Sequence, residues 1–212
     1  MIIAVDGPSA AGKGTLSRRL AAHFGLAHLD TGALYRAVGL AVLRSGGDPS
    51  DPATSIAAAK ALAHETLDDP DIRSERTAAA ASKLAPIPEV RAVLLAFQRD
   101  FAAKPPGDAR GAVLDGRDIG TVVCPGADVK LFLVASAEAR AERRLKELRE
   151  RGIEAISSDV LQDMKERDAR DQARAVAPMV PAQDAVVLDT TDLDADAAFE
   201  NALESIESRS VV

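Results

Sequence analysis

The stretch that decides the fold runs Ile2-Ile3-Ala4-Val5-Asp6-Gly7-Pro8-Ser9-Ala10-Ala11-Gly12-Lys13-Gly14-Thr15. Its first part is an apolar run that is too short for a helix and fits a buried strand. A glycine-rich turn comes next, and Leu16, Leu20 and Phe24 then follow at the spacing of one helix face. The order strand, glycine-rich turn, Gly-Lys and helix is the arrangement that binds a nucleoside triphosphate.

The chemistry of this loop follows from its residue types. Glycines let backbone N–H groups close around phosphate oxygens, and the N-terminus of the helix faces the negative charge. We expect Lys13 to reach the β- and γ-phosphates of ATP and Thr15 to offer a hydroxyl to Mg²⁺. The alternative is a tight strand-to-helix turn with an incidental lysine. The predicted ATP contacts from the loop are Gly7, Pro8, Ser9, Ala10, Ala11, Gly12, Lys13, Gly14 and Thr15.

The position of the hydroxyl narrows the class of enzyme. Gly14 follows Lys13, so the hydroxyl of Thr15 comes one position later than in the common Gly-Lys-Ser/Thr form. This Gly-Lys-Gly-Thr ending resembles nucleoside monophosphate kinases more than GTPases or motor-type ATPases.

Composition excludes several other classes. The chain has 212 residues, of which 47% are hydrophobic and 28% charged, as in an ordinary globular protein. Its formal net charge of −7 disfavours nucleic acid and anionic membranes as partners, although a local basic cleft remains open. No apolar run approaches membrane-spanning length, and the single cysteine, Cys124, suits a reducing compartment as a small buried residue. We expect a cytoplasmic monomer.

Short apolar runs alternate with helical patterns along the chain. This alternation predicts an α/β fold, with a parallel sheet between two layers of helices around the phosphate-binding (P-loop) turn. The expected strands are 2–5, 112–114, 129–134 and 185–188. The first expected helix carries Leu16, Leu20 and Phe24 on one face, and the second follows Thr31. Further helices occupy most of 53–103, including 53–66, and then cover 136–151, 158–175 and a last segment with Phe199, Leu203 and Ile206 on one face.

A polar turn follows the second expected strand. Asp115-Gly116-Arg117-Asp118 comes directly after Leu114, which places it at the carboxyl edge of the sheet, where open α/β sheets bind ligands. Asp115 could hold Mg²⁺ through water while Arg117 reaches a phosphate. The alternative is a surface turn with a local Asp–Arg pair.

Arginines also recur late in the chain. Arg167, Asp171 and Arg174 stand at i, i+4 and i+7, so one helix face presents two guanidinium groups around a carboxylate. These residues could belong to a solvated, charge-laced helix, because Glu166 and Arg170 have the same spacing. Together with the loop, however, they indicate a lid that closes over ATP and excludes water.

The helix before this one presents the same choice. It carries Arg140, Arg143 and Arg144, with glutamates nearby. We expect lid residues here as well, with Arg144 as a contact to ATP.

Several stretches together are more specific than any one motif: Ile3-Ala4-Val5-Asp6-Gly7-Pro8-Ser9-Ala10-Ala11-Gly12-Lys13-Gly14-Thr15, Leu29-Asp30-Thr31-Gly32-Ala33-Leu34-Tyr35-Arg36, Asp115-Gly116-Arg117-Asp118-Ile119-Gly120-Thr121-Val122-Val123, Lys165-Glu166-Arg167-Asp168 and Arg174-Ala175-Val176-Ala177-Pro178. In this order they resemble the bacterial cytidylate kinases over nearly the whole chain. The resemblance implies transfer of the ATP γ-phosphoryl group to CMP or dCMP with Mg²⁺, which Thr15 and Asp115 would hold.

The resemblance also implies a role for each site residue. Lys13, Arg117, Arg167 and Arg174 would be catalytic. Arg36 would bind the acceptor phosphate beside Thr31 and Tyr35, and Asp171 would contact the acceptor as the site closes. The cytosine would be read by Ser82, Arg91 and Asp118.

This assignment is chemically sound, because a carboxylate accepts from the cytosine amino group and an arginine donates to its carbonyl and ring nitrogen. Uracil would present an acceptor to the same carboxylate and leave a buried charge unpaired.

The resemblance divides the single domain 1–212 into working parts. Residues 45–105 would bind the acceptor nucleotide, and residues 144–174 would form the lid and the arginine helix. The chain departs from longer members of the family between Arg44 and Arg73, where those members carry an insert that builds a small antiparallel sheet. Discrimination between monophosphates could therefore be looser here.

Two rival functions make different predictions. The first is another small-molecule P-loop kinase, acting on AMP, UMP or shikimate. The second is a nucleotide-dependent switch, but a GTPase would carry an Asn-Lys-x-Asp motif and the only asparagine of this chain is Asn201.

Overall fold

The computed structural model describes residues 1–62, 67 and 69–208. A five-stranded sheet in the order β2-β3-β1-β4-β5 forms its centre, and every neighbouring pair of strands is parallel. The strands are β1 (Ile2–Asp6), β2 (Ala27–Asp30), β3 (Ala112–Gly116), β4 (Val129–Val134) and β5 (Val186–Asp189). The expected α/β fold with a parallel sheet is confirmed.

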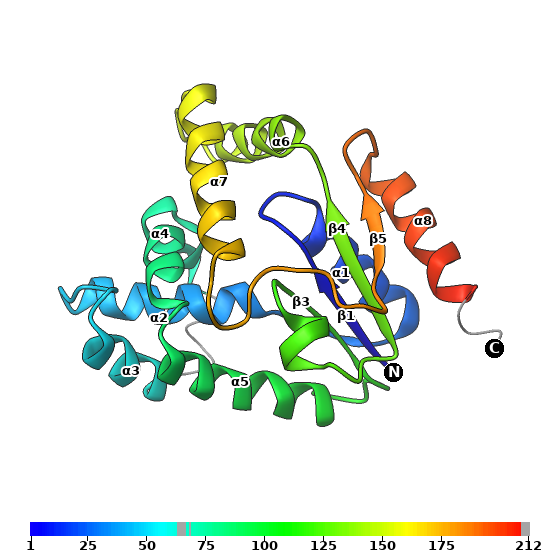
Figure 1. The fold of residues 1–212 in the computed structure, drawn as a ribbon, viewed down its shortest axis with the longest axis horizontal. Coiled ribbons are helices and arrows are strands. Elements are labelled where there is room, and N and C mark those ends of the chain that lie inside the picture. The colour runs from blue at the N-terminus through cyan, green and yellow to red at the C-terminus, as the bar shows by residue number, and fades with distance from the viewer. Residues whose placement is uncertain (63–66, 68, 209–212) are drawn as a thin grey trace.

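Helices cover both faces of the sheet, as Figure 1 shows. Ile3 and Val5 of β1 pack on the side of α1 (Lys13–Phe24) and α8 (Ala195–Glu207), whereas Ala4 packs on the side of α2 (Thr31–Arg44) and α5 (Pro88–Ala103). All three β1 residues are fully buried. This double burial explains why β1 is a continuous apolar run, since strands covered on both faces do not alternate with polar residues.

The helices between α2 and α5 are short and begin with strong capping residues. They are α3 (Pro52–Lys60), the 3₁₀ turn η2 (Pro70–Arg73) and α4 (Glu75–Leu84). Asp51, Asp69 and Ser74 each accept a backbone N–H at these N-termini. The expected helix over 53–66 is confirmed as far as Lys60, and its residues 63–66 lie outside the described residues.

Two helices form a layer of their own above the carboxyl edge of the sheet. α6 (Ala137–Glu150) begins at the predicted cap, Ser136, and α7 (Ser157–Gln172) follows it. Their facing sides bury a small cluster that includes Leu145, Leu148 and Met164. In Figure 1, α7 lies between α6 and α4, and it contacts both helices.

The structure differs from the sequence prediction in three places. β2 was not expected, because Ala27-His28-Leu29-Asp30 is short and half polar; it forms at the edge of the sheet by pairing with β3. Asp115 and Gly116 are the last residues of β3 rather than part of the turn that follows it. That turn continues into a single π-helical turn, η3 (Ile119–Val123).

Two smaller expectations can also be checked. Cys124 is buried, as its apolar context predicted. Within the described residues, no helix is both long and apolar enough to cross a membrane.

Candidate active site

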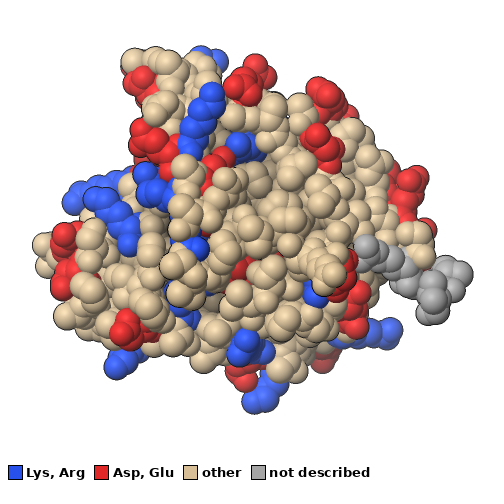
Figure 2. Space-filling view, viewed as in Figure 1, with Lys and Arg blue, Asp and Glu red and all other residues tan. Residues whose placement is uncertain are grey.

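A cavity of about 560 Å³ lies at the carboxyl edge of the sheet. Its walls come from the glycine-rich loop, α2, α4, α5, the end of β3, α6 and α7. Nine lysine or arginine side chains line it against five acidic ones, although the whole chain carries a net charge of −7. Figure 2 shows basic side chains gathering on the side of the molecule where α4 and α7 lie. This cavity attracts anions.

The glycine-rich loop forms one wall, and its backbone is shaped by positive φ angles. Ala10 has φ 58° and Gly12 has φ 91°, so the loop curls around the start of α1. The ammonium of Lys13 donates to the carbonyl of Pro8 at 2.7 Å. Burial, reinforced by the charge of Arg117, lowers the pKa of Lys13 to about 7. An anion placed in this loop would favour the charged form of that lysine.

Six of the nine predicted loop residues border the cavity: Ser9, Ala10, Gly12, Lys13, Gly14 and Thr15. The other three support the loop from behind. Gly7 lies so close to β4 that a Cβ there would stand 2.2 Å from the carbonyl oxygen of Leu133. The carbonyl of Pro8 accepts the hydrogen bond from Lys13, and Ala11 is fully buried in the core.

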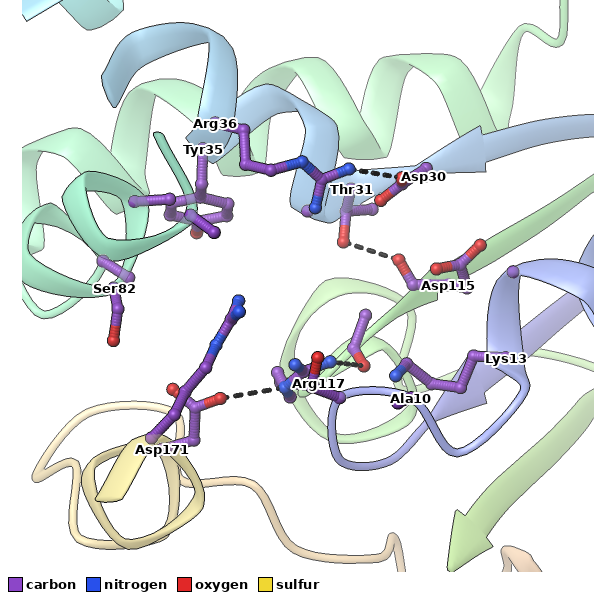
Figure 3. Close-up of a pocket in the computed structure, with 18 of the residues that line it drawn as sticks. Ala10, Lys13, Asp30, Thr31, Tyr35, Arg36, Ser82, Asp115, Arg117 and Asp171 are labelled. Atoms are coloured by element: carbon purple, nitrogen blue, oxygen red, sulfur yellow. Dashed lines mark hydrogen bonds and ion pairs between the residues drawn. The ribbon is translucent and has the colours of Figure 1, made fainter. Parts of the chain in front are cut away.

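The opposite wall begins at the N-terminus of α2. The hydroxyl of Thr31 donates to the carbonyl of Asp115 at 2.7 Å, which ties α2 to the end of β3. Arg36 donates to the carboxylate of Asp30 at 2.6 Å. Figure 3 shows Thr31, Tyr35 and Arg36 on this side of the pocket and Lys13 on the other.

The predicted base-reading residues come together deeper in the cavity. Arg91 on α5 pairs with Asp118 after β3, and both are buried. Its guanidinium also lies 5.8 Å from the centre of the Tyr35 ring. Burial raises the pKa of Asp118, although Arg91 and Arg174 act against that rise. The Ser82 hydroxyl lines the same space, is buried and has no hydrogen-bond partner among the described residues.

The arginine helix α7 supplies the third wall. Asp171 is buried on α7 and pairs with Arg117 at 2.9 Å and with Arg174. The expected helix over 158–175 ends at Gln172, so Arg174 reaches Asp171 from the segment just beyond the helix. Arg167 also lines the cavity, and burial, with the nearby charge of Arg117, lowers its pKa to about 10. The Nε of Arg167 is buried without a partner among the described residues. These contacts show that Arg167 and Asp171 do not belong to a solvated, charge-laced helix face. Arg170 does, because it is exposed and pairs with Glu166 one turn away at 3.9 Å.

The three α6 arginines that the sequence analysis singled out make different contacts. Arg140 is buried and joins the loop to α7, donating to Ser9 at 3.3 Å and pairing with Asp168 at 2.7 Å. Arg143 donates instead to backbone carbonyls after β5 and is not among the residues that line the cavity. Arg144 lines the cavity between Glu75 and Glu147.

The predicted metal ligands fit the coordination that Mg²⁺ prefers. Thr15 and Asp115 both border the cavity, and one Asp115 oxygen is 2.7 Å from His28. No group of three or more metal-ligating side chains forms among the described residues. Mg²⁺ characteristically takes one or two protein ligands and keeps waters and substrate phosphates for the rest. The donor set is therefore adequate for Mg²⁺ that arrives with ATP.

Sequence reasoning missed several residues of the site. Asp6, at the end of β1, accepts from the backbone N–H groups of Ile119 at 2.8 Å and Gly120 at 2.7 Å, and thereby holds the turn that carries Arg117 and Asp118. Asp30, at the end of β2, also lines the cavity, although the sequence assigned it no role. The position of Asp6 before the loop, a charge closing an apolar strand, was a signal that could have identified it.

Comparisons with known proteins agree with the geometry. A family model described as cytidylate kinase matches residues 3–208. A cytidylate kinase of Paramagnetospirillum magneticum is 64% identical over 208 residues, which cover 98% of each chain. One of Rhodospirillum rubrum is 58% identical over 210 residues, with 99% of each chain covered. An uncharacterized protein of Eubacterium ventriosum, solved by crystallography, has a TM-score of 0.58 at 14% identity over 98% of this chain and 99% of its own, a likeness of fold alone.

Proposed function

Since the chain belongs to the cytidylate kinase family, we propose that the cavity at the carboxyl edge of its sheet is the site of phosphoryl transfer. The chain is an ATP-dependent nucleoside monophosphate kinase, and it converts CMP or dCMP to the diphosphate. One observation carries the assignment of the site: the glycine-rich loop and the Arg91–Asp118 pair border the same cavity.

The donor half of the site is the glycine-rich loop. Its backbone N–H groups would hold the β- and γ-phosphates of ATP, and Lys13 would contribute a point charge. The lowered pKa of Lys13 supports this role. Burial makes the charged ammonium unfavourable in free energy until an anion lies beside it.

The acceptor half lies opposite. Arg36 would bind the phosphate of CMP, beside Thr31 and Tyr35. The carboxylate of Asp118 would accept from the cytosine amino group, while Arg91 and Ser82 would donate to the ring. Support comes from the buried Ser82 hydroxyl, which lacks a partner among the described residues and faces this space.

The transferring group is stabilised by positive charge. Phosphoryl transfer asks the protein mainly to align two oxygens and to neutralise the charge on the moving group. Arg117, Arg167 and Arg174 would do so, and Asp171 would hold two of them in place. Bound Mg²⁺, held by Thr15 and through water by Asp115, would shield the phosphates of ATP.

Within this domain we assign acceptor binding to residues 45–105 and the lid with its arginine helix to residues 144–174. Ser82 and Arg91 support the first assignment. The second assignment is supported by Arg140, which links Ser9 of the glycine-rich loop to Asp168 of α7. This link would couple the position of the lid to that of the loop. We also propose a monomer in the cytoplasm, a location that would supply both nucleotides.

A panel of acceptors tests the function. We expect kcat/KM for CMP and dCMP to exceed that for UMP, AMP and shikimate. Asp118→Ala should remove this preference for CMP and leave the KM for ATP unchanged. The matched control is Asp108→Ala, which removes an exposed carboxylate that precedes β3 and does not line the cavity.

Two results would contradict the proposal. The first is an acceptor such as AMP that outperforms CMP. The second is rapid ADP release without any acceptor, which would indicate a nucleotide-dependent switch. For the metal, Thr15→Val should raise the Mg²⁺ concentration needed for half-maximal rate without changing the KM for CMP.

A further inference from the structure

The carboxylate of Asp30 makes two different contacts, one with each oxygen. Its Oδ1 accepts from the backbone N–H of Ala33 at 3.0 Å, which caps the N-terminus of α2. Its Oδ2 accepts from Nη2 of Arg36 at 2.6 Å. The capping contact fixes the side chain relative to the helix, so the second oxygen holds the arginine from a rigid position.

Gly32 leaves the space in which this pair forms. A Cβ at this position would stand 2.9 Å from Nη1 of Arg36 and 3.1 Å from Oδ1 of Asp30. Because the clash falls mainly on the end of a flexible side chain, a larger residue would displace the guanidinium rather than the backbone. We therefore expect the lack of a side chain at Gly32 to matter for the orientation of Arg36 rather than for the backbone of α2.

One edge of the Arg36 guanidinium can still bind an anion while the other edge pairs with Asp30. The Nε of Arg36 is buried and has no hydrogen-bond partner among the described residues. Both Asp30 and Arg36 lie on the cavity wall, as Figure 3 shows. Although burial favours the neutral acid, the charge and the hydrogen bond of Arg36 keep the pKa of Asp30 below its usual range. The carboxylate therefore stays charged and continues to hold the arginine.

We infer that Asp30 and Gly32 are positioning residues, which hold the guanidinium of Arg36 so that its free edge meets the acceptor's phosphate. This inference rests on the proposed function, in which Arg36 binds that phosphate. A misplacement of about 1 Å at such a group costs up to roughly 100-fold in rate. Helix capping alone would give Asp30 no such influence.

The first test is Asp30→Asn. Asparagine caps a helix as well as aspartate does, but its amide cannot accept from Arg36 while its oxygen is engaged at the cap. We expect kcat/KM for CMP to fall roughly 10- to 100-fold, with the KM for ATP and the Tm unchanged. The matched control is Asp194→Asn, since Asp194 caps α8 in the same manner. Activity equal to that of the wild type would show that Asp30 only caps α2 and would overturn the inference.

Gly32→Ala provides a second route, which retains the capping carboxylate and crowds the Arg36 guanidinium most closely. We expect a rise in the KM for CMP with no loss of Tm. A KM for CMP equal to that of the wild type would overturn the role of Gly32.

Arg36→Met separates this inference from the function on which it rests. If Asp30 acts through Arg36, adding Asp30→Asn to Arg36→Met should cause no further loss. Additive losses would overturn the inference and leave the site intact. If Arg36→Met alone leaves the KM for CMP unchanged, the assignment of the acceptor phosphate fails, and the inference fails with it.

Discussion

Arg91 and Asp118 form a buried ion pair across the acceptor half of the cavity. The two residues come from different elements, α5 and the turn after β3, and are 27 positions apart in the chain. Burial raises the pKa of Asp118, and the charge of Arg91 is the strongest influence against that rise. The guanidinium therefore favours the ionised form of the carboxylate that we propose accepts from the cytosine amino group.

Arg91→Met should make CMP binding depend on pH. Without the guanidinium the pKa of Asp118 rises further, so a larger fraction of it is protonated at a given pH. A protonated carboxyl accepts less well from the cytosine amino group. We expect the KM for CMP to increase as the pH falls, and this increase to begin at a higher pH in the variant than in the wild type. Identical pH profiles in variant and wild type, measured at saturating ATP, would contradict this role.

Gly7→Ala should destabilise the whole domain. The new Cβ would overlap the backbone of Leu133, and a φ of 140° is a conformation that alanine rarely adopts. Overpacking and backbone strain each cost about 1 to 3 kcal/mol, so we expect a loss of about 3 kcal/mol in the free energy of unfolding in urea. Gly14→Ala is the control, because its Cβ would meet only the end of Arg18 at 3.5 Å within a helix. An equal effect of the two substitutions would exclude this explanation.

Asp171→Asn should reduce both stability and activity. Asp171 is 1% exposed and pairs with Arg117 and Arg174, so its loss leaves both cations without their ion-pair partner. Breaking a buried pair in this way costs about 3 kcal/mol or more. Because the two arginines would also lose their orientation, kcat/KM for CMP should fall. Asp163→Asn, at an exposed position of the same helix, should change neither property. A fully active and stable Asp171→Asn protein would show that the arginines do not depend on this carboxylate.

Asp6 should give the stability a measurable dependence on pH. Burial raises its pKa from 3.8 to about 6, so the folded protein holds the proton more tightly than the unfolded chain does. Its contribution to stability is then fully present below pH 4 and is lost as the pH rises through 6, a change of up to about 3 kcal/mol. The measurement is the difference in unfolding free energy between the wild type and Asp6→Asn from pH 4.5 to 7.5. A difference that stays constant across this range would contradict the raised pKa.

The glycine-rich loop and most helices could be predicted because their signals are local. Lys13 and Thr15 follow a strand within one short segment, and Ser136 caps α6 as expected. β2 was not predicted because a strand of four residues is too short to show a hydrophobic pattern. It forms at the edge of the sheet by pairing with β3. The separate roles of the α6 arginines could not be predicted either, because they depend on tertiary contacts. Charge spacing alone did not distinguish Arg143, which holds the backbone after β5, from Arg144, which faces the cavity.

The sequence by itself determined the donor loop, the alternation of strands and helices, and the family, since each depends on residues close together or on their order. Only the tertiary structure decided which charges meet. Arg117 pairs with Asp171 across 54 positions, and Arg140 on α6 joins Ser9 to Asp168. The reason is physical: the strength of a charge pair depends on distance and burial, and both are set by how the sheet and the helices pack.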